Sequence, residues 1–128
     1  MNIQALFDAM TKQMQRERAE SQMTLGKLIT VLEAMPKDSM VANLCDPRSY
    51  RGYYIDLAFD HEKGKRPAVE LLKECKETVG KVFSGYKGGD YVMDESTPIW
   101  IAGYGECGVK LIALYADGRF DTQEDDYE

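Results

Sequence analysis

Aromatic and cationic side chains gather beside glycines in three stretches of this 128-residue chain. Aromatic faces can stack on a flat ring, fixed cations pair with anions, and glycine backbone lets a ligand approach closely. If a sheet brings the three stretches to one edge, they predict a binding site for an anionic, ring-containing molecule such as a nucleotide. The candidate residues are Arg48, Tyr50, Arg51, Tyr53, Tyr54, Tyr86, Lys87, Gly88, Gly89, Asp90, Tyr91, Trp100 and Tyr104.

The same residues also have a purely structural interpretation, in which the tyrosines cover sheet edges and keep their hydroxyl groups in water. They suit a protein–protein interface as well, because interface hot spots favour arginine and aromatic side chains. The sequence leaves these interpretations open.

The residues that usually carry nucleophilic or metal chemistry are few and scattered. Cys45, Cys75 and Cys107 are widely spaced, and the single histidine, His61, lies in a charged segment. Cysteine catalysis needs a neighbouring base, and zinc sites need ligands at characteristic spacings. We therefore expect a protein that is not an enzyme, with no catalytic residue, no metal and no cofactor. A bound zinc would make Cys45, His61 and Cys107 the first candidate ligands.

The glycines at 103, 105 and 108 match the spacing of a dinucleotide-binding turn. That turn must lead from a strand into a helix whose N-terminus receives the pyrophosphate, whereas a second strand-like run follows here. The segment is typical of a hairpin instead. The stretch GYKGGDY likewise lacks the spacing of a P-loop.

The charge distribution argues against several kinds of partner. The formal net charge is −6, and five acids lie in the last nine residues, so residues 1–119 are close to neutral. Binding to duplex nucleic acid needs a basic face that neutralises phosphates, and the one dense basic run, KGKR at residues 63–66, is diluted by Glu62, so we expect no such binding. We also expect no membrane partner and a cytoplasmic location, because no apolar run approaches the ~20 residues that cross a bilayer and the N-terminus does not resemble a secretion signal.

Hydrophobic periodicity predicts three helices. Residues 2–22 carry a short apolar stripe, which can pack on the domain or on the same helix of a second copy. Thr24 is a suitable N-cap for a second helix, which Pro36 stops near Ala34. A third helix is expected over residues 67–83, and its apolar face consists of Val69, Leu72, Cys75, Val79 and Phe83.

Strands are expected at 40–44, 53–60, 91–93, 99–104 and 109–115, with a loop at 46–52 and a charged turn at 61–66. In the second strand the period of two places Tyr53 with Leu57 and Phe59 on one face, and Tyr54 with Asp56 on the other. The elements predict a two-layer α+β fold with a mainly antiparallel sheet of about five strands and three helices. We expect an N-terminal amphipathic helix at 1–22 that can serve as an oligomerisation arm, a compact domain at 23–119 and an acidic tail at 120–128.

Two stretches resemble a family of small proteins encoded by bacteriophages and prophages. They are SYRGYYIDLAF at residues 49–59 and GYKGGDY at residues 85–91, and the resemblance extends over residues 23–117. It carries over no catalytic residue. It implies a phage protein that counters a host defence or another host process in the infected bacterium. Two modes of action follow: sequestering a small nucleotide-like anion in the pocket of arginine, tyrosine, lysine and glycine residues, or docking on a host protein through the same aromatic surface.

Overall fold

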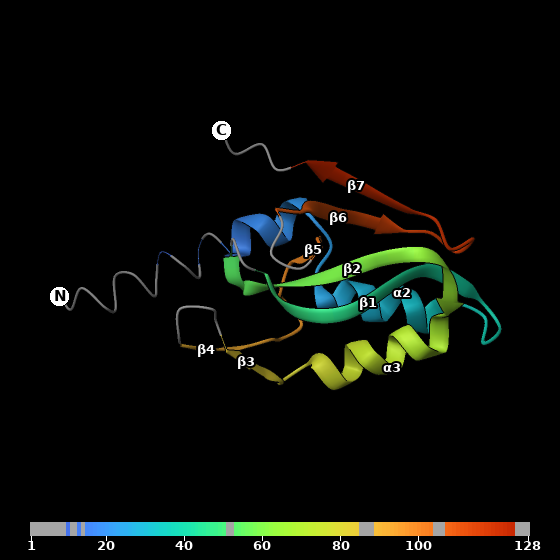
Figure 1. The fold of residues 1–128 in the computed structure, drawn as a ribbon, viewed down its shortest axis with the longest axis horizontal. Coiled ribbons are helices and arrows are strands. Elements are labelled where there is room, and N and C mark those ends of the chain that lie inside the picture. Colours follow the sequence, from blue (N-terminus) through green and yellow to red (C-terminus); the bar gives the residue numbers. More distant parts are fainter. Residues whose placement is uncertain are drawn as a thin grey trace.

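The computed structural model describes residues 10, 13, 15–50, 53–84, 89–103 and 107–124. The elements are α2 (Leu25–Ala34), β1 (Met40–Tyr50), β2 (Tyr53–Pro67), α3 (Ala68–Thr78), β3 (Val82–Ser84), β4 (Asp90–Val92), β5 (Ile99–Ile101), β6 (Val109–Leu114) and β7 (Phe120–Glu124). Residues 15–21 are helical as well. The main sheet has the order β1–β2–β5–β6–β7, and β3 pairs with β4 in a separate hairpin (Figure 1). All neighbours are antiparallel except β2 and β5, so the predicted α+β fold is confirmed.

Helix α2 forms where the local signals predict it. The Thr24 hydroxyl accepts a hydrogen bond from the backbone N–H of Lys27 at 3.2 Å, which caps the helix. Leu25, Leu28 and Leu32 are buried in the main core. Together with α3, the helix packs on the face of the sheet that bears such side chains as Leu57 and Phe59 of β2.

Strands β1 and β2 are longer than the sequence pattern indicates. The loop expected at 46–52 is wrong for residues 46–50, which continue β1, and the turn expected at 61–66 is wrong because this segment pairs with the first half of β1. The register shifts between Cys45 and Arg48, and Asp46 between them adopts φ 50. The turn-forming residues thus produce a β-bulge inside a strand, because the pairing on both sides of them is strong enough to continue.

Helix α3 is shorter than expected, and the face that it buries differs from the predicted apolar face. It ends at Thr78, and Gly80 follows at φ +82, so the residues expected in its last turn form β3 instead. Its buried residues are Ala68, Leu71, Cys75 and Thr78, whereas Val69 is 47% exposed and Val79 is 37% exposed. The predicted apolar face was wrong at the two valines, because it was fitted to a helix that continued through the strand.

The acidic tail was expected to begin at residue 120. Instead, residues 120–124 form β7, which pairs antiparallel with β6 along the edge of the main sheet. The turn before it is held by Gly118, whose φ is +90 and whose carbonyl accepts a hydrogen bond from the N–H of Ala42 in β1. The described part of the tail therefore belongs to the compact domain, and its acids project from an edge strand.

The sheet buries side chains on both faces. Leu57 and Phe59 of β2 lie in the main core, while Ala58 between them belongs to a second apolar cluster with Trp100 of β5. Successive side chains of a strand point to opposite faces, so this second cluster lies on the face away from α2 and α3. Of the helices that the structure describes, none has the length and apolar character needed to span a membrane.

Candidate functional site

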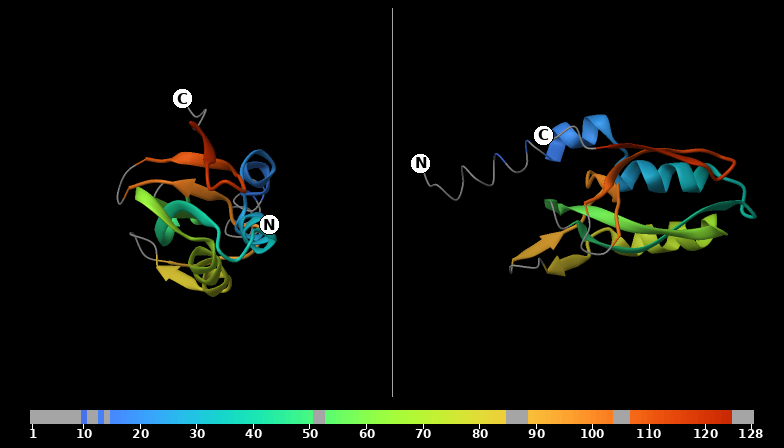
Figure 2. Two further views of the ribbon diagram at one scale, coloured as in Figure 1. Left: turned by 90° about the vertical axis from the view of Figure 1, so that its right-hand side faces the viewer. Right: turned by 45° about the horizontal axis from the view of Figure 1, so that its top comes forward.

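The described flanks of the three aromatic stretches meet at one end of the molecule. The Tyr50 hydroxyl at the end of β1 accepts a hydrogen bond from the N–H of Gly108, just before β6, at 2.7 Å. Tyr54 of β2 stacks on Tyr91 of β4, with 5.6 Å between ring centroids. This is the end from which the β3–β4 hairpin extends (Figure 2). The candidate residues Arg51, Tyr86, Lys87, Gly88 and Tyr104 lie outside the described residues.

Three of the candidate aromatic rings stack on one another. The rings of Tyr50 and Tyr53 lie against Trp100, at centroid distances of 4.6 Å and 5.5 Å. Trp100 has no exposed surface, and Tyr50 is buried. Ring surface that the sequence assigned to a ligand is thus used inside the protein, in the second apolar cluster.

Tyr53 and Tyr54 point to the faces opposite to those that strand alternation predicts. Tyr53 packs in the second cluster rather than with Leu57, and Tyr54 stacks on Tyr91, which lies against the main core. The β1–β2 ladder shifts register at the end of β1, so the simple period of two does not extend to the first residues of β2. This register shift explains why Tyr53 and Tyr54 point to the faces opposite to the predicted ones.

A buried ion pair that the sequence did not suggest lies under these rings. Arg18, from the helical residues 15–21, donates from Nε and Nη2 to the two carboxylate oxygens of Asp56, at 2.7 Å and 3.0 Å. Trp100 donates from Nε1 to Asp56 Oδ2 at 2.7 Å. The Arg18 guanidinium also lies 4.2 Å from the centre of the Tyr53 ring. The Asp56 side chain is fully buried, and that of Arg18 is 12% exposed.

The electrostatics of Asp56 reflect two opposing effects. Burial raises the pKa of this carboxyl above its usual range, because removal from water penalises the charged form. The hydrogen bonds and positive charge of Arg18, and the indole N–H of Trp100, act in the opposite direction. Asp56 therefore depends on Arg18 for its charge to be tolerated in the protein interior.

One signal in the sequence could have indicated this second buried face. The β5 segment Ile99-Trp100-Ile101 is apolar at three consecutive positions, which is typical of a strand covered on both sides. A neighbouring strand then needs small or paired residues on its second face, as Ala58 and Asp56 are. Arg18 carried no comparable signal, since it lies 38 residues away in the sequence.

The remaining described candidates also have partners inside the protein. Arg48 donates from Nη2 to Asp60 Oδ1 at 3.1 Å and to the Ala102 carbonyl at 2.5 Å, which ties β1 to β2 and to the residue that follows β5. Asp90 accepts a hydrogen bond from the Ser84 hydroxyl across the β3–β4 hairpin at 3.2 Å. Gly89, with φ +86, leads into β4. These contacts position the hairpin and the end of the sheet.

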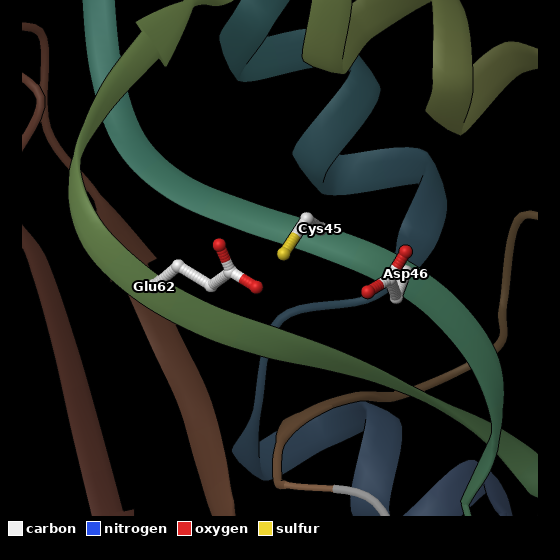
Figure 3. Close-up of side chains that lie close together, drawn as sticks. All are labelled: Cys45, Asp46 and Glu62. Carbon is white, nitrogen blue, oxygen red and sulfur yellow. The ribbon is translucent and has the colours of Figure 1, made fainter.

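Cys45, Asp46 and Glu62 form a cluster at the β-bulge (Figure 3), where their ligand-type atoms lie within 4.8 Å of one another. A thiolate and two carboxylates could together hold a divalent cation. Burial, followed by the charges of Glu62, Asp46 and Asp60, raises the pKa of the Cys45 thiol, so it is not activated as a nucleophile. The His61 ring packs edge-on against Phe120, at a centroid distance of 4.7 Å.

No protein-family model, no curated protein and no solved structure matches this chain.

Proposed function

We propose that this chain is a phage-encoded, non-enzymatic binding protein that counters a host process by docking on a host protein. The likeness of two of its stretches to phage proteins supports the origin. The observation that carries the docking surface is an exposed apolar pair on the β3–β4 hairpin.

The two faces of this hairpin differ in what they contact. Phe83 and Tyr91 form a cross-strand pair that packs against the main core. Val82 and Val92 form the next pair, and their exposed fractions are 54% and 60%. Burial of such a pair against a partner would contribute roughly 25 cal/mol for each Å² of apolar surface removed from water. The hairpin extends from one end of the main sheet (Figure 2), so a partner could reach this face.

The internal contacts of the described candidates favour docking on a protein over sequestering a nucleotide. Tyr50 and Tyr53 each stack on Trp100, and the Arg48 guanidinium is paired with Asp60. A nucleotide would need ring faces and cations that can turn toward it. Two of the thiols also fit a non-enzymatic role, because burial raises the pKa of Cys75 to about 12 and raises the pKa of Cys45 as well.

The test is a comparison of variants in capture from bacterial host lysate. The tagged chain is expected to retain one host protein at a fixed ratio, and the double variant Val82→Ser/Val92→Ser should bind it about tenfold more weakly or worse, since two apolar anchors are lost. The matched control is Val69→Ser, which removes a valine of similar exposure at the start of α3, and it should bind normally.

Equal capture by the double variant and the control would contradict the hairpin surface. Release of a nucleotide on denaturing the purified chain, together with a nucleotide-dependent rise in its melting temperature, would favour the sequestering function instead. Variants Arg51→Ala and Lys87→Ala would then show whether these two residues supply the cations that bind the nucleotide.

A further inference from the structure

The surroundings of Asp56 have the features of a recognition site for a guanidinium group. Both carboxylate oxygens accept hydrogen bonds from Arg18, and the indole of Trp100 holds one of them in place. The Tyr53 ring provides a π face 4.2 Å from the guanidinium carbon. A carboxylate beside an aromatic face selects arginine over lysine. The planar guanidinium can donate to both carboxylate oxygens in parallel while its flat face lies on the ring.

We infer that Asp56, Trp100 and Tyr53 form a binding site for an arginine side chain of the partner protein, and that Arg18 occupies this site in the free chain. The inference rests on the proposed docking function. It adds the chemical nature of the group that the partner presents, and it makes the helical residues 15–21 a cover that the partner displaces.

The way in which residues 15–21 are attached supports the exchange. None of these residues is buried, whereas Gln22 and Met23, which follow them, are 4% and 6% exposed. The N–H of Met23 donates to the Leu111 carbonyl, and the Gln22 amide donates to the Ile99 carbonyl, so the chain is fixed to the sheet from residue 22 onward. Among the described residues before that point, Arg18 forms the ion pair with Asp56. The Gln15 side-chain amide adds a weaker hydrogen bond of 3.5 Å to the Ile55 carbonyl.

Displacing this cover takes none of its own side chains out of a fully buried position, because none of residues 15–21 is fully buried. The site lies toward the same end of the sheet as the hairpin but on the opposite face, because Tyr53 packs with Trp100 whereas Tyr54 stacks on Tyr91 of the hairpin. A partner that engages both the hairpin and Asp56 must therefore extend around this end of the sheet.

Competition with Arg18 sets the conditions under which binding can be observed. A group tethered in the same chain has an effective concentration in the millimolar range. An isolated arginine peptide should therefore fail to displace Arg18 from the unmodified protein, whereas a partner that also engages the hairpin can do so. Removing the Arg18 side chain should make the site available to small probes.

The experiment uses the full chain with Arg18→Ala and two probes, the amidated tripeptides Gly-Arg-Gly and Gly-Lys-Gly. Thermal unfolding and calorimetry should show binding of the arginine peptide, at about one tenth of the concentration that the lysine peptide requires. The matched control Arg16→Ala removes an exposed arginine from the same helical segment and leaves Arg18 in place, so it should not respond. The double variant Arg18→Ala/Asp56→Asn should lose the response.

A folded Arg18→Ala variant that responds to neither peptide, or equally to both, would overturn the inference. If this variant is unfolded at neutral pH, the titration is read as recovery of the near-ultraviolet circular dichroism of the aromatic cluster. Recovery with the arginine peptide alone supports the site, and absence of recovery contradicts it. The assay contains no host protein, so its failure is distinct from a failure of lysate capture.

Discussion

Asp56 is the residue whose environment has the clearest energetic consequence. It is a fully buried carboxylate that depends on one cation, so Arg18→Ala should lower the free energy of unfolding at neutral pH by about 3–5 kcal/mol. The loss should depend on pH. Without Arg18 the pKa of Asp56 in the folded state rises further above the unfolded value of about 3.9. The contribution of Asp56 to the stability of the variant is then greatest below that value and falls as pH rises through the folded-state pKa.

Urea unfolding of the two proteins across this pH range measures the effect. The deficit of Arg18→Ala should shrink as the pH is lowered toward the pKa of an ordinary aspartate, whereas Arg16→Ala should match the unmodified chain throughout. A deficit that is constant with pH would show that the charge of Asp56 is not the cause.

Single residues also show which contacts could be predicted from the sequence. Thr24 could be assigned as an N-cap because its partner, Lys27, lies three residues away. The pairing of Arg18 with Asp56 could not, because it depends on how a helical segment meets a strand 38 residues later. The gathering of aromatic side chains at one end was visible in the sequence, but the mutual stacking of Tyr50 and Trp100 was not.

At the scale of elements, two glycines with positive φ provide a matched pair, Gly64 at a register shift within β2 and Gly118 in the turn before β7. Gly64 and Gly118 have nearly the same φ, +87 and +90, but a Cβ on Gly64 would meet nothing within 4 Å, whereas one on Gly118 would lie 2.5 Å from the Met40 carbonyl oxygen. Gly64→Ala should therefore cost only the left-handed backbone penalty of about 1–2 kcal/mol. Gly118→Ala should cost clearly more, because β1 must also move. Urea unfolding of both variants compares them, and equal losses would contradict the close contact of the turn with β1.

The elements that sequence patterns located well are those with local signals. Helix α2 has a cap and a proline stop, and β4, β5 and β6 begin within one residue of their expected positions. Strand β7 was missed because its exposed acids resemble a tail, and only pairing with β6 makes it a strand. The second half of β2 was missed for the same reason, since its charged residues become a strand through the pairing with β1.

At the scale of the whole molecule, the three cysteines differ in how deeply they are buried. Cys107 is exposed, Cys45 is intermediate and Cys75 is fully buried, with a pKa raised to about 12. A thiol-reactive dye should therefore modify Cys107 first and Cys45 more slowly, while Cys75 should react only when the core opens. Single-cysteine variants followed by mass spectrometry measure the three rates. Labelling of Cys75 at the rate of Cys107 would contradict the described core.

The parallel pairing of β2 with β5 sets the order in which the chain can fold. The β1–β2 and β6–β7 ladders join neighbouring segments, whereas Leu57 must wait for Ile99, which follows α3 and the β3–β4 hairpin. Contacts between distant segments form slowly, because the intervening chain must first be brought together. During synthesis, a chain that ends before Ile99 leaves the inner edge of β2 unpaired in the main sheet. Until the segment that contains β5 leaves the ribosome, that edge is open to other chains and to chaperones.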